Sequence, residues 1–166
     1  MTEEKKGFRL DWATLKLAVI LFAFAAEKTA AAMREVLPAE SYTPVEGSAA
    51  GKIELVKEIY AAGDKGWVVM VAPSGFGGEL DMAVGVDKSG AVTGVSIVSM
   101  SETSGLGANA NRESFRSQYV GRSGSVALRK QGGEIDALTG ATVTSTAVTR
   151  GVNAALAAAS ELIRGA

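Results

Sequence analysis

The chain has 166 residues, of which 47% are hydrophobic and 21% charged, a length and composition that fit one globular domain with a substantial core. Its 17 basic and 18 acidic residues give a formal charge of -1, which argues against nucleic acid as a partner. The chain contains no cysteine and no histidine, so disulfides, thiolate or imidazole metal sites and Ser-His-Asp catalysis are excluded. We expect no metal site, and any redox chemistry would require a bound organic cofactor.

A long helix is predicted at the N-terminus. Apolar residues recur there at helical spacing, and Pro38 marks the point where the helix must stop. The residues of this pattern are Leu15, Val19, Phe22, Ala26, Ala30, Met33 and Leu37. We therefore divide the chain into an N-terminal helix over residues 1–38 and a folded domain over residues 39–166.

The uninterrupted apolar run of this helix, Leu17–Ala26, is ten residues long, whereas a helix that spans a bilayer needs ~20 apolar residues. Two interpretations stay open. In the one we favour, the segment is a shortened membrane anchor, and Lys5, Lys6 and Arg9 keep its N-terminal side in the cytoplasm, which places the following domain on the extracytoplasmic side. In the other, it is an amphipathic helix that packs on the domain.

Four runs rich in valine and isoleucine follow a linker around residues 41–51 and are typical of strands. The segment Asp87–Gly90, between the last two runs, has the composition of a hairpin turn. The runs are Lys52–Ala61, Gly66–Val71, Leu80–Val86 and Ala91–Val98. Consecutive strands joined in this way predict an antiparallel meander.

Two helices are predicted after the strands. The first is short, over Arg112–Val120, and a glycine-rich loop follows it. The second runs from about Ser145 to Arg164 and carries one apolar stripe. Because the strands are grouped between helices rather than alternating with them, the expected fold class is α+β, an antiparallel meander sheet with flanking helices and a long N-terminal helix.

The loop before the last helix is rich in hydroxyl groups. Five of the eleven residues from Asp136 to Thr146 are serine or threonine, and Gly140 and Ala141 lie at their centre. Free N–H groups at the start of a helix stabilise an anion, and small residues let the backbone approach it, so the segment suits a phosphate. The alternative is that Thr144 or Ser145 simply caps the helix and Thr142 is a turn residue.

The segment Asp136–Thr142 resembles the pattern Asp-x-x-Ser/Thr-Gly-Ala-Thr of a family of FMN-binding domains. These domains occur in the G subunits of Rnf-type electron transport complexes and in the C subunits of sodium-translocating NADH:quinone oxidoreductases. The resemblance implies that FMN is joined through a phosphoester to the hydroxyl of Thr142. It also implies that a flavin transferase, which uses FAD as donor, recognises the motif that begins at Asp136.

Other segments support this resemblance, which runs from about Lys28 to Leu162. The segment Ser101–Gly107 is similar to the family's His-x-Glu-Thr-Pro-Gly-Leu-Gly loop, and Gly75–Gly78 is similar to its Gly-Tyr-Gly-Gly loop. Phe115, Gln118, Tyr119 and Gly121 resemble its Phe-x-x-Gln-Phe-x-Gly stretch. This chain departs from the family in lacking the histidine ahead of Glu102 and in carrying Ser104 where proline is usual. The serine leaves that loop less restricted in φ.

The resemblance implies a flavin site between the 102–107 and 139–146 loops. The residues expected to bind the cofactor around Thr142 are Phe76, Glu102, Thr103, Leu106, Thr139, Gly140, Ala141, Thr144 and Ser145. Two of these have plain structural alternatives, since Glu102 could be a solvated loop carboxylate and Phe76 a packing residue.

The function that follows is an electron-relay subunit of a membrane ion-translocating electron transport complex, rather than a stand-alone catalyst. Its expected partners are the other subunits of such a complex and the flavin transferase. Two alternatives remain, a non-redox extracytoplasmic binding module with a helical anchor and a soluble flavin domain of a reductase.

Overall fold

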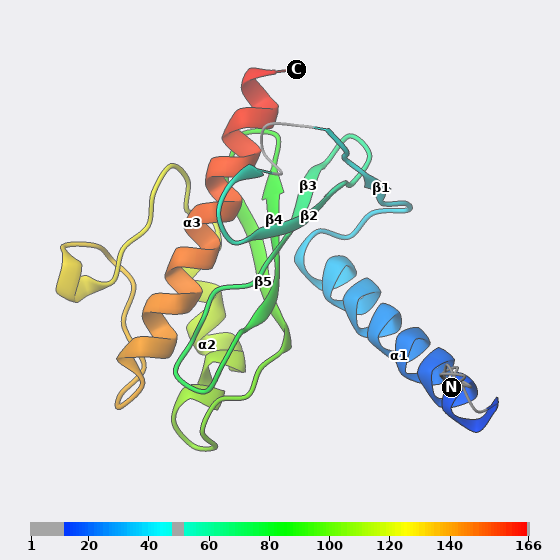
Figure 1. Ribbon diagram of the computed structural model, residues 1–166. Coiled ribbons are helices and arrows are strands. Elements are labelled where there is room, and N and C mark those ends of the chain that lie inside the picture. The colour runs from blue at the N-terminus through cyan, green and yellow to red at the C-terminus, as the bar shows by residue number, and fades with distance from the viewer. Residues whose placement is uncertain (1–11, 48–51, 166) are drawn as a thin grey trace, which may run out of the picture.

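The computed structural model of the protein describes residues 12–47 and 52–165. A five-stranded sheet forms the middle layer, and a helix packs on each of its faces (Figure 1). The predicted N-terminal helix is described from Trp12, so Lys5, Lys6 and Arg9 lie outside the described residues.

Each strand of the sheet pairs antiparallel with the next along the chain, which is the predicted meander, and the predicted α+β class is confirmed. The strands are β1 (Thr43–Pro44), β2 (Val56–Ala61), β3 (Gly66–Val71), β4 (Asp81–Asp87) and β5 (Val92–Ser99). The run predicted from Lys52 begins as a strand only at Val56. The N–H of Val56 donates to the carbonyl of Ile53 at 3.1 Å, and this hydrogen bond closes a turn instead.

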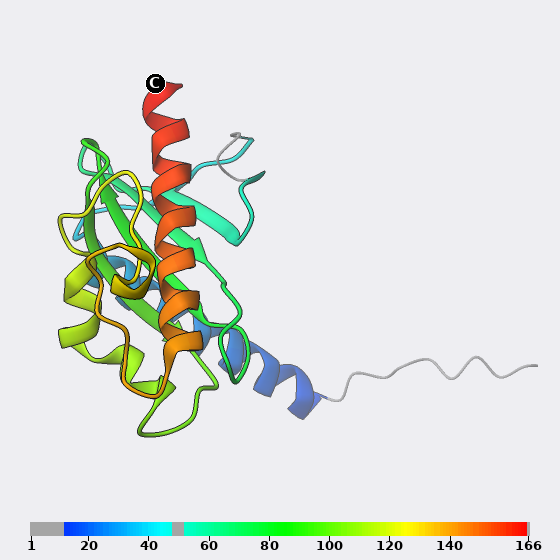
Figure 2. The ribbon, with the colours of Figure 1, turned by 90° about the vertical axis from the view of Figure 1, so that its left-hand side faces the viewer.

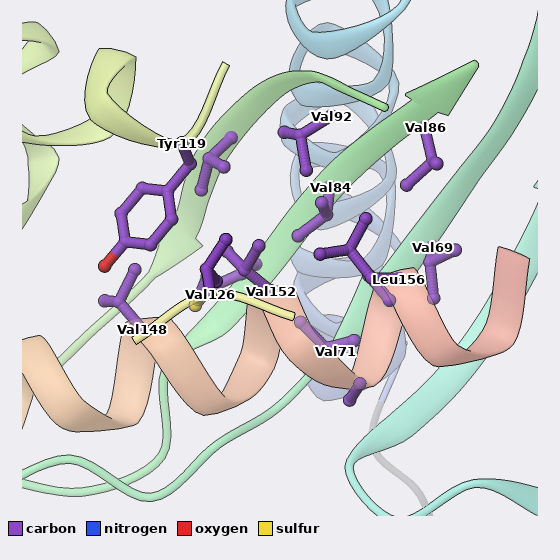
Figure 3. Close-up of a cluster of buried hydrophobic side chains, with 14 of the residues drawn as sticks. Val69, Val71, Val84, Val86, Val92, Tyr119, Val126, Val148, Val152 and Leu156 are labelled. Atoms are coloured by element: carbon purple, nitrogen blue, oxygen red, sulfur yellow. The ribbon is translucent and has the colours of Figure 1, made fainter. Parts of the chain in front are cut away.

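The larger core lies between the sheet and α3 (Thr142–Arg164), whose apolar stripe is buried from Val148 to Ala159. Alternate residues of a strand face opposite sides of a sheet, so the odd-numbered valines of β3 and the even-numbered valines of β4 reach this core together. Figure 3 shows Val69, Val71, Val84 and Val86 against Val148, Val152 and Leu156.

The other face of the sheet receives the end of α1 (Trp12–Val36), which stops two residues before Pro38. Gly85 and Gly94 lie opposite each other in β4 and β5. A Cβ atom on Gly85 would lie 2.5 Å from the carbonyl oxygen of Val36, and one on Gly94 would lie 2.9 Å from its Cα. The two glycines therefore form a notch for the backbone of Val36, whose carbonyl accepts a 2.6 Å hydrogen bond from the hydroxyl of Thr93.

The first half of α1 extends past the sheet (Figure 2). Leu17, Ile20 and Phe24 are 58%, 64% and 56% exposed there. None of the helices within residues 12–47 and 52–165 combines the length and the apolar character needed to cross a bilayer.

Short helical segments connect β5 to α3. They are η2 (Gly107–Asn111), α2 (Glu113–Arg116), η3 (Ser117–Tyr119) and η4 (Arg129–Gln131), so the helix predicted over Arg112–Val120 is divided into α2 and η3. Phe115 and Tyr119 are buried, and their rings meet edge to face at 5.7 Å. The hydroxyls of Tyr119 and Thr149 are 2.9 Å apart, which ties η3 to α3. Burial raises the pKa of Tyr119 to about 12, although the hydrogen bond with Thr149 opposes the shift.

Candidate functional site

Three segments that are distant in sequence enclose a pocket of about 380 Å³. They are the loop after β3, the loop after β5 and the start of α3. Its lining residues are Phe76, Glu102, Thr103, Leu106, Gly107, Gly140, Ala141, Thr142, Val143 and Thr144. A depression of about 450 Å³ at residues 121–135 contains none of the predicted site residues. We therefore place the candidate site in the first pocket.

Glu102 joins all three segments. One of its carboxylate oxygens accepts a 2.7 Å hydrogen bond from the hydroxyl of Thr144, and the other accepts a 3.1 Å hydrogen bond from the N–H of Gly77. The approach is close, because a Cβ atom on Gly75 would lie 2.2 Å from one of these oxygens and one on Gly107 would lie 2.4 Å from the other. Glu102 is half-buried with both oxygens engaged, so it is a structural tie in the pocket wall rather than a freely solvated carboxylate.

The start of α3 presents free backbone donors. The helix begins at Thr142, three residues before the predicted start, and Ala141 in the N-cap position supplies no side-chain hydrogen bond. Among the described residues, the N–H groups of Thr142, Val143 and Thr144 have no hydrogen-bond partner, and the first paired N–H is that of Ser145, which donates to the carbonyl of Ala141 at 3.0 Å. This is the positive end of the helix.

The interpretation of Thr144 or Ser145 as the helix cap is wrong, because both lie inside the first turn of α3. Ser145 is fully buried and does not line the pocket. Its hydroxyl donates to the carbonyl of Ala141 and accepts from the N–H of Leu138, each at 2.9 Å. The Ser145 side chain therefore holds the loop before the helix in shape.

Thr142 differs from its neighbouring hydroxyl residues. Its side chain is exposed at the pocket, and its hydroxyl makes no hydrogen bond within the described part of the chain. The hydroxyl of Thr144 is committed to Glu102, and that of Thr146 to the carbonyl of Thr142 at 2.8 Å. Thr139 is also exposed but does not line the pocket. Of the motif's hydroxyls, that of Thr142 alone is both uncommitted and in the pocket wall.

Gly140 makes the turn that carries Thr142 to the pocket. Its φ of 74° lies in the left-handed region, which a residue with a side chain rarely adopts. A Cβ atom at this position would also lie 3.1 Å from Cδ2 of Leu106. Both the backbone conformation and the contact with the opposite loop therefore favour glycine.

The pocket has an apolar rim, and the one ionisable residue of its described lining is acidic. Phe76, Leu106 and Val143 are 74%, 45% and 54% exposed, and each comes from a different one of the three segments. Glu102 is the one ionisable residue in the described lining, which contains no lysine or arginine. An anion bound here would rely on the N–H groups of α3 rather than on a basic side chain.

Asp136 lies outside this pocket lining. Its carboxylate forms an exposed two-point ion pair with Arg129, with contacts of 2.7 and 3.3 Å, and the Arg129 guanidinium lowers the pKa of Asp136. The backbone N–H and carbonyl of Asp136 are both hydrogen-bonded to the side chain of Gln118.

The structure thus brings most of the predicted residues into one pocket and leaves Thr139, Ser145 and Asp136 outside its lining. Gly107 and Val143 line the pocket but were not predicted as site residues. Both adjoin a predicted site residue, so the family motifs could have indicated them. No sequence signal pointed to Arg129, which lies in a glycine-rich loop.

The fold and these motifs define a flavin-binding class of domain, and the comparisons agree: residues 75–157, half of the chain, match the FMN-binding domain family. The chain belongs to that family. It is 32% identical to the G subunit of the Na(+)-translocating ferredoxin:NAD(+) oxidoreductase complex of Acetobacterium woodii, over 91% of this chain and 94% of that protein.

A second relative is the G subunit of the proton-translocating ferredoxin:NAD(+) oxidoreductase complex of Clostridium ljungdahlii, which is 42% identical. That match covers 63% of this chain and 61% of the relative. The crystal structure of the C subunit of the Na(+)-translocating NADH-quinone reductase from Parabacteroides distasonis has a TM-score of 0.58. It is 16% identical, and the match covers 93% of this chain and 98% of that one, so it supports the fold alone.

Proposed function

We propose that this chain is an electron-transfer subunit of an ion-translocating oxidoreductase complex and that it carries FMN joined by a phosphoester to Thr142. The observation that carries the proposal is the position of Thr142. Its uncommitted hydroxyl lies in the pocket wall, at the end of α3 where three N–H groups are free. Family membership and the names of the relatives support the same function.

The residues of the pocket fit the cofactor. The free N–H groups of α3 would bind the phosphate, and Gly140 and Ala141 leave room for it. The volume of about 380 Å³ falls within the ~300–1,000 Å³ of pockets that hold small ligands. Phe76, Leu106 and Val143 would cover the apolar part of the ring system. Bound FMN would supply reversible one- or two-electron transfer, and the residues of this chain would orient it.

Attachment is a phosphoryl-group transfer that requires FAD and a flavin transferase. The Thr142 oxygen would form a bond to the FMN phosphorus of FAD, the pyrophosphate bond would break, and AMP would leave. The hydroxyl proton would pass to a base of the transferase. Asp136 is the residue of this chain that we propose the transferase recognises, since its carboxylate is exposed at the start of the motif.

The location we propose is the cell membrane, with the N-terminal helix as a single attachment and the flavin domain on the extracytoplasmic side. The exposed apolar residues Leu17, Ile20 and Phe24 at the projecting end of α1 support an attachment. The other subunits of the complex would be the partners there.

The test is the intact mass of the denatured chain after co-expression with a flavin transferase. We expect the wild-type chain to be heavier than its sequence by one FMN less one water. Thr142→Ala should lack the added mass, and Thr139→Ala should retain it. No added mass on the wild type, while the same transferase modifies a known substrate, would overturn the proposal and favour a non-redox binding module.

A further inference from the structure

The backbone of Asp136 is held at both of its polar groups by one side chain from a distant segment. The N–H of Asp136 donates to Oε1 of Gln118 at 2.7 Å, and Nε2 of Gln118 donates to the carbonyl of Asp136 at 3.2 Å. We call this pair of hydrogen bonds the Gln118 clasp. It bridges 18 residues of sequence and leaves the Asp136 carboxylate outside the clasp.

Gln118 is itself held close to α3, the helix that carries Thr142. It lies in η3 beside Tyr119, which is fully buried and whose hydroxyl is bonded to that of Thr149 in α3. Thr142 is the first residue of α3. The Gln118 clasp therefore fixes the backbone of Asp136 relative to the helix that carries Thr142.

The other end of the motif loop is fixed by Ser145, which is bonded to the N–H of Leu138 and to the carbonyl of Ala141. Hydrogen bonds from Gln118 at one end and Ser145 at the other therefore hold the loop from Asp136 to Ala141. A transferase that reads Asp136 and modifies Thr142 would therefore meet both residues at a set separation and would not need to order the loop.

The ion pair with Arg129 is a weaker constraint on Asp136. Both side chains are about two-thirds exposed, at 68% and 66%, and exposed ion pairs are weakened by water and salt. The Gln118 clasp acts on the backbone and uses no charge. The two contacts therefore have separable effects. The ion pair with Arg129 acts on the Asp136 carboxylate, and the Gln118 clasp fixes the position of the Asp136 backbone.

We propose that Gln118 is a positioning residue for flavin attachment, which presents Asp136 to the transferase at a fixed place relative to Thr142. The proposal rests on the proposed function, in which Thr142 is the residue modified. Gln118 touches neither the flavin nor the reacting oxygen in this account, and it acts through the Asp136 backbone.

The experiment measures the initial rate of FMN incorporation into the purified flavin-free chain, with a flavin transferase and FAD, over a range of chain concentrations. We expect Gln118→Ala to lower kcat/KM by about tenfold or more, because a transferase bound to a displaced Asp136 would meet the Thr142 oxygen out of line with FAD, and a small misplacement of reacting atoms is costly. The matched control is Gln131→Ala. Gln131 is exposed in η4 of the same loop region, and its side chain makes no hydrogen bond within the described residues. It should stay within about twofold of the wild type.

A second measurement separates positioning from general folding. Hydrogen exchange of the Asp136 amide should become faster in Gln118→Ala, while amides in the middle of α3 keep their protection. If Gln118→Ala does not fold, Gln118→Glu serves instead. It retains an oxygen that accepts from the Asp136 N–H but places a second carboxylate oxygen against the Asp136 carbonyl, so a loss of rate is again expected.

The outcomes are distinguishable. Wild-type rates and unchanged Asp136 exchange in a folded Gln118 variant would overturn the role of Gln118 alone. The role of Gln118 would also be overturned if amides throughout the chain lost protection together, because the substitution would then have destabilised the whole fold. No FMN on the wild-type chain would overturn the proposed function, and the role of Gln118 with it.

Discussion

Thr144 and Glu102, 42 residues apart, are joined by a 2.7 Å hydrogen bond from the threonine hydroxyl to the carboxylate. Thr144 is 1% exposed, so its hydroxyl depends on this acceptor. The bond fixes the start of α3 against the loop after β5. The two loops that the family motifs identified therefore face each other across one pocket.

Removal of the Glu102 carboxylate should destabilise this junction. We expect Glu102→Ala to lower the free energy of unfolding by about 1–3 kcal/mol, because a buried hydroxyl and the N–H of Gly77 lose a charged acceptor. Urea unfolding measures the difference. Thr103→Ala is the control, since Thr103 is exposed and its side chain makes no hydrogen bond within the described residues. Equal stability of both variants would show that the tie is not needed.

Gly140→Val should give a folded chain without flavin. The side chain would be strained at a φ of 74° and would press on Leu106 beside the proposed phosphate position. Gly124→Val is a matched control, because Gly124 has a φ of 72° but no atom within 4 Å of an added Cβ. Both variants should lose about 1–3 kcal/mol of stability from backbone strain. Intact mass should show FMN on Gly124→Val only, and FMN on Gly140→Val would contradict the proposed approach of the phosphate.

Gly94→Ala should loosen the end of α1 from the sheet. The added methyl group would lie 2.9 Å from the Cα of Val36, so the helix must move. We expect a loss of about 1–3 kcal/mol, the usual cost of overpacking, together with faster proteolysis within α1. Limited proteolysis followed by mass spectrometry locates the cut. FMN attachment should persist, because Val36, Gly85 and Gly94 do not line the pocket. A cleavage pattern like that of the wild type would argue against the notch.

The contribution of Glu35 to stability should depend on pH. Burial opposes its ionisation, but hydrogen bonds from Ser96 and Arg116 and the charge of Arg116 prevail, so its pKa is lowered from 4.5. A carboxyl group with a lowered folded pKa stabilises the protein above its unfolded pKa, and the stabilisation is lost as the pH falls through the folded value.

Glu35→Gln should therefore cost up to about 1 kcal/mol near neutral pH, since the Glu35 side chain is about half exposed. The difference from the wild type should fade as the pH falls from neutral through the lowered folded pKa of Glu35. Urea unfolding over this range of pH measures it. A difference that grows in acid would mean that the sign of the pKa shift is wrong.

The membrane location is tested by carbonate extraction of membranes from the native host. We expect the chain to stay in the pellet, as an anchored subunit does. A helix that only packs on the domain would be released instead. Clean release would remove the anchor from the proposal but leave the flavin assignment intact, because no described residue of α1 lines the pocket that contains Thr142.

The sequence by itself indicated the meander, because runs rich in valine and isoleucine and the Asp87–Gly90 turn are local signals for strands and the hairpins that join them. It also indicated the three loops of the pocket, through short contiguous motifs. It predicted the start of α3 three residues too late. The alternative in which Thr144 or Ser145 caps the helix was wrong. The Thr144 hydroxyl bonds to Glu102, 42 residues away, and the Ser145 hydroxyl bonds to Ala141 and Leu138 in the preceding loop.

Only the tertiary structure decided which groups those motifs bring together. The Glu102 tie, the Gln118 clasp and the notch that Gly85 and Gly94 form for Val36 span between 18 and 58 residues of sequence. Such contacts have no local periodicity and depend on how the helices pack on the twisted sheet. The same packing leaves the hydroxyl of Thr142 uncommitted at the pocket, while the next two threonine hydroxyls along α3, those of Thr144 and Thr146, are hydrogen-bonded to other groups.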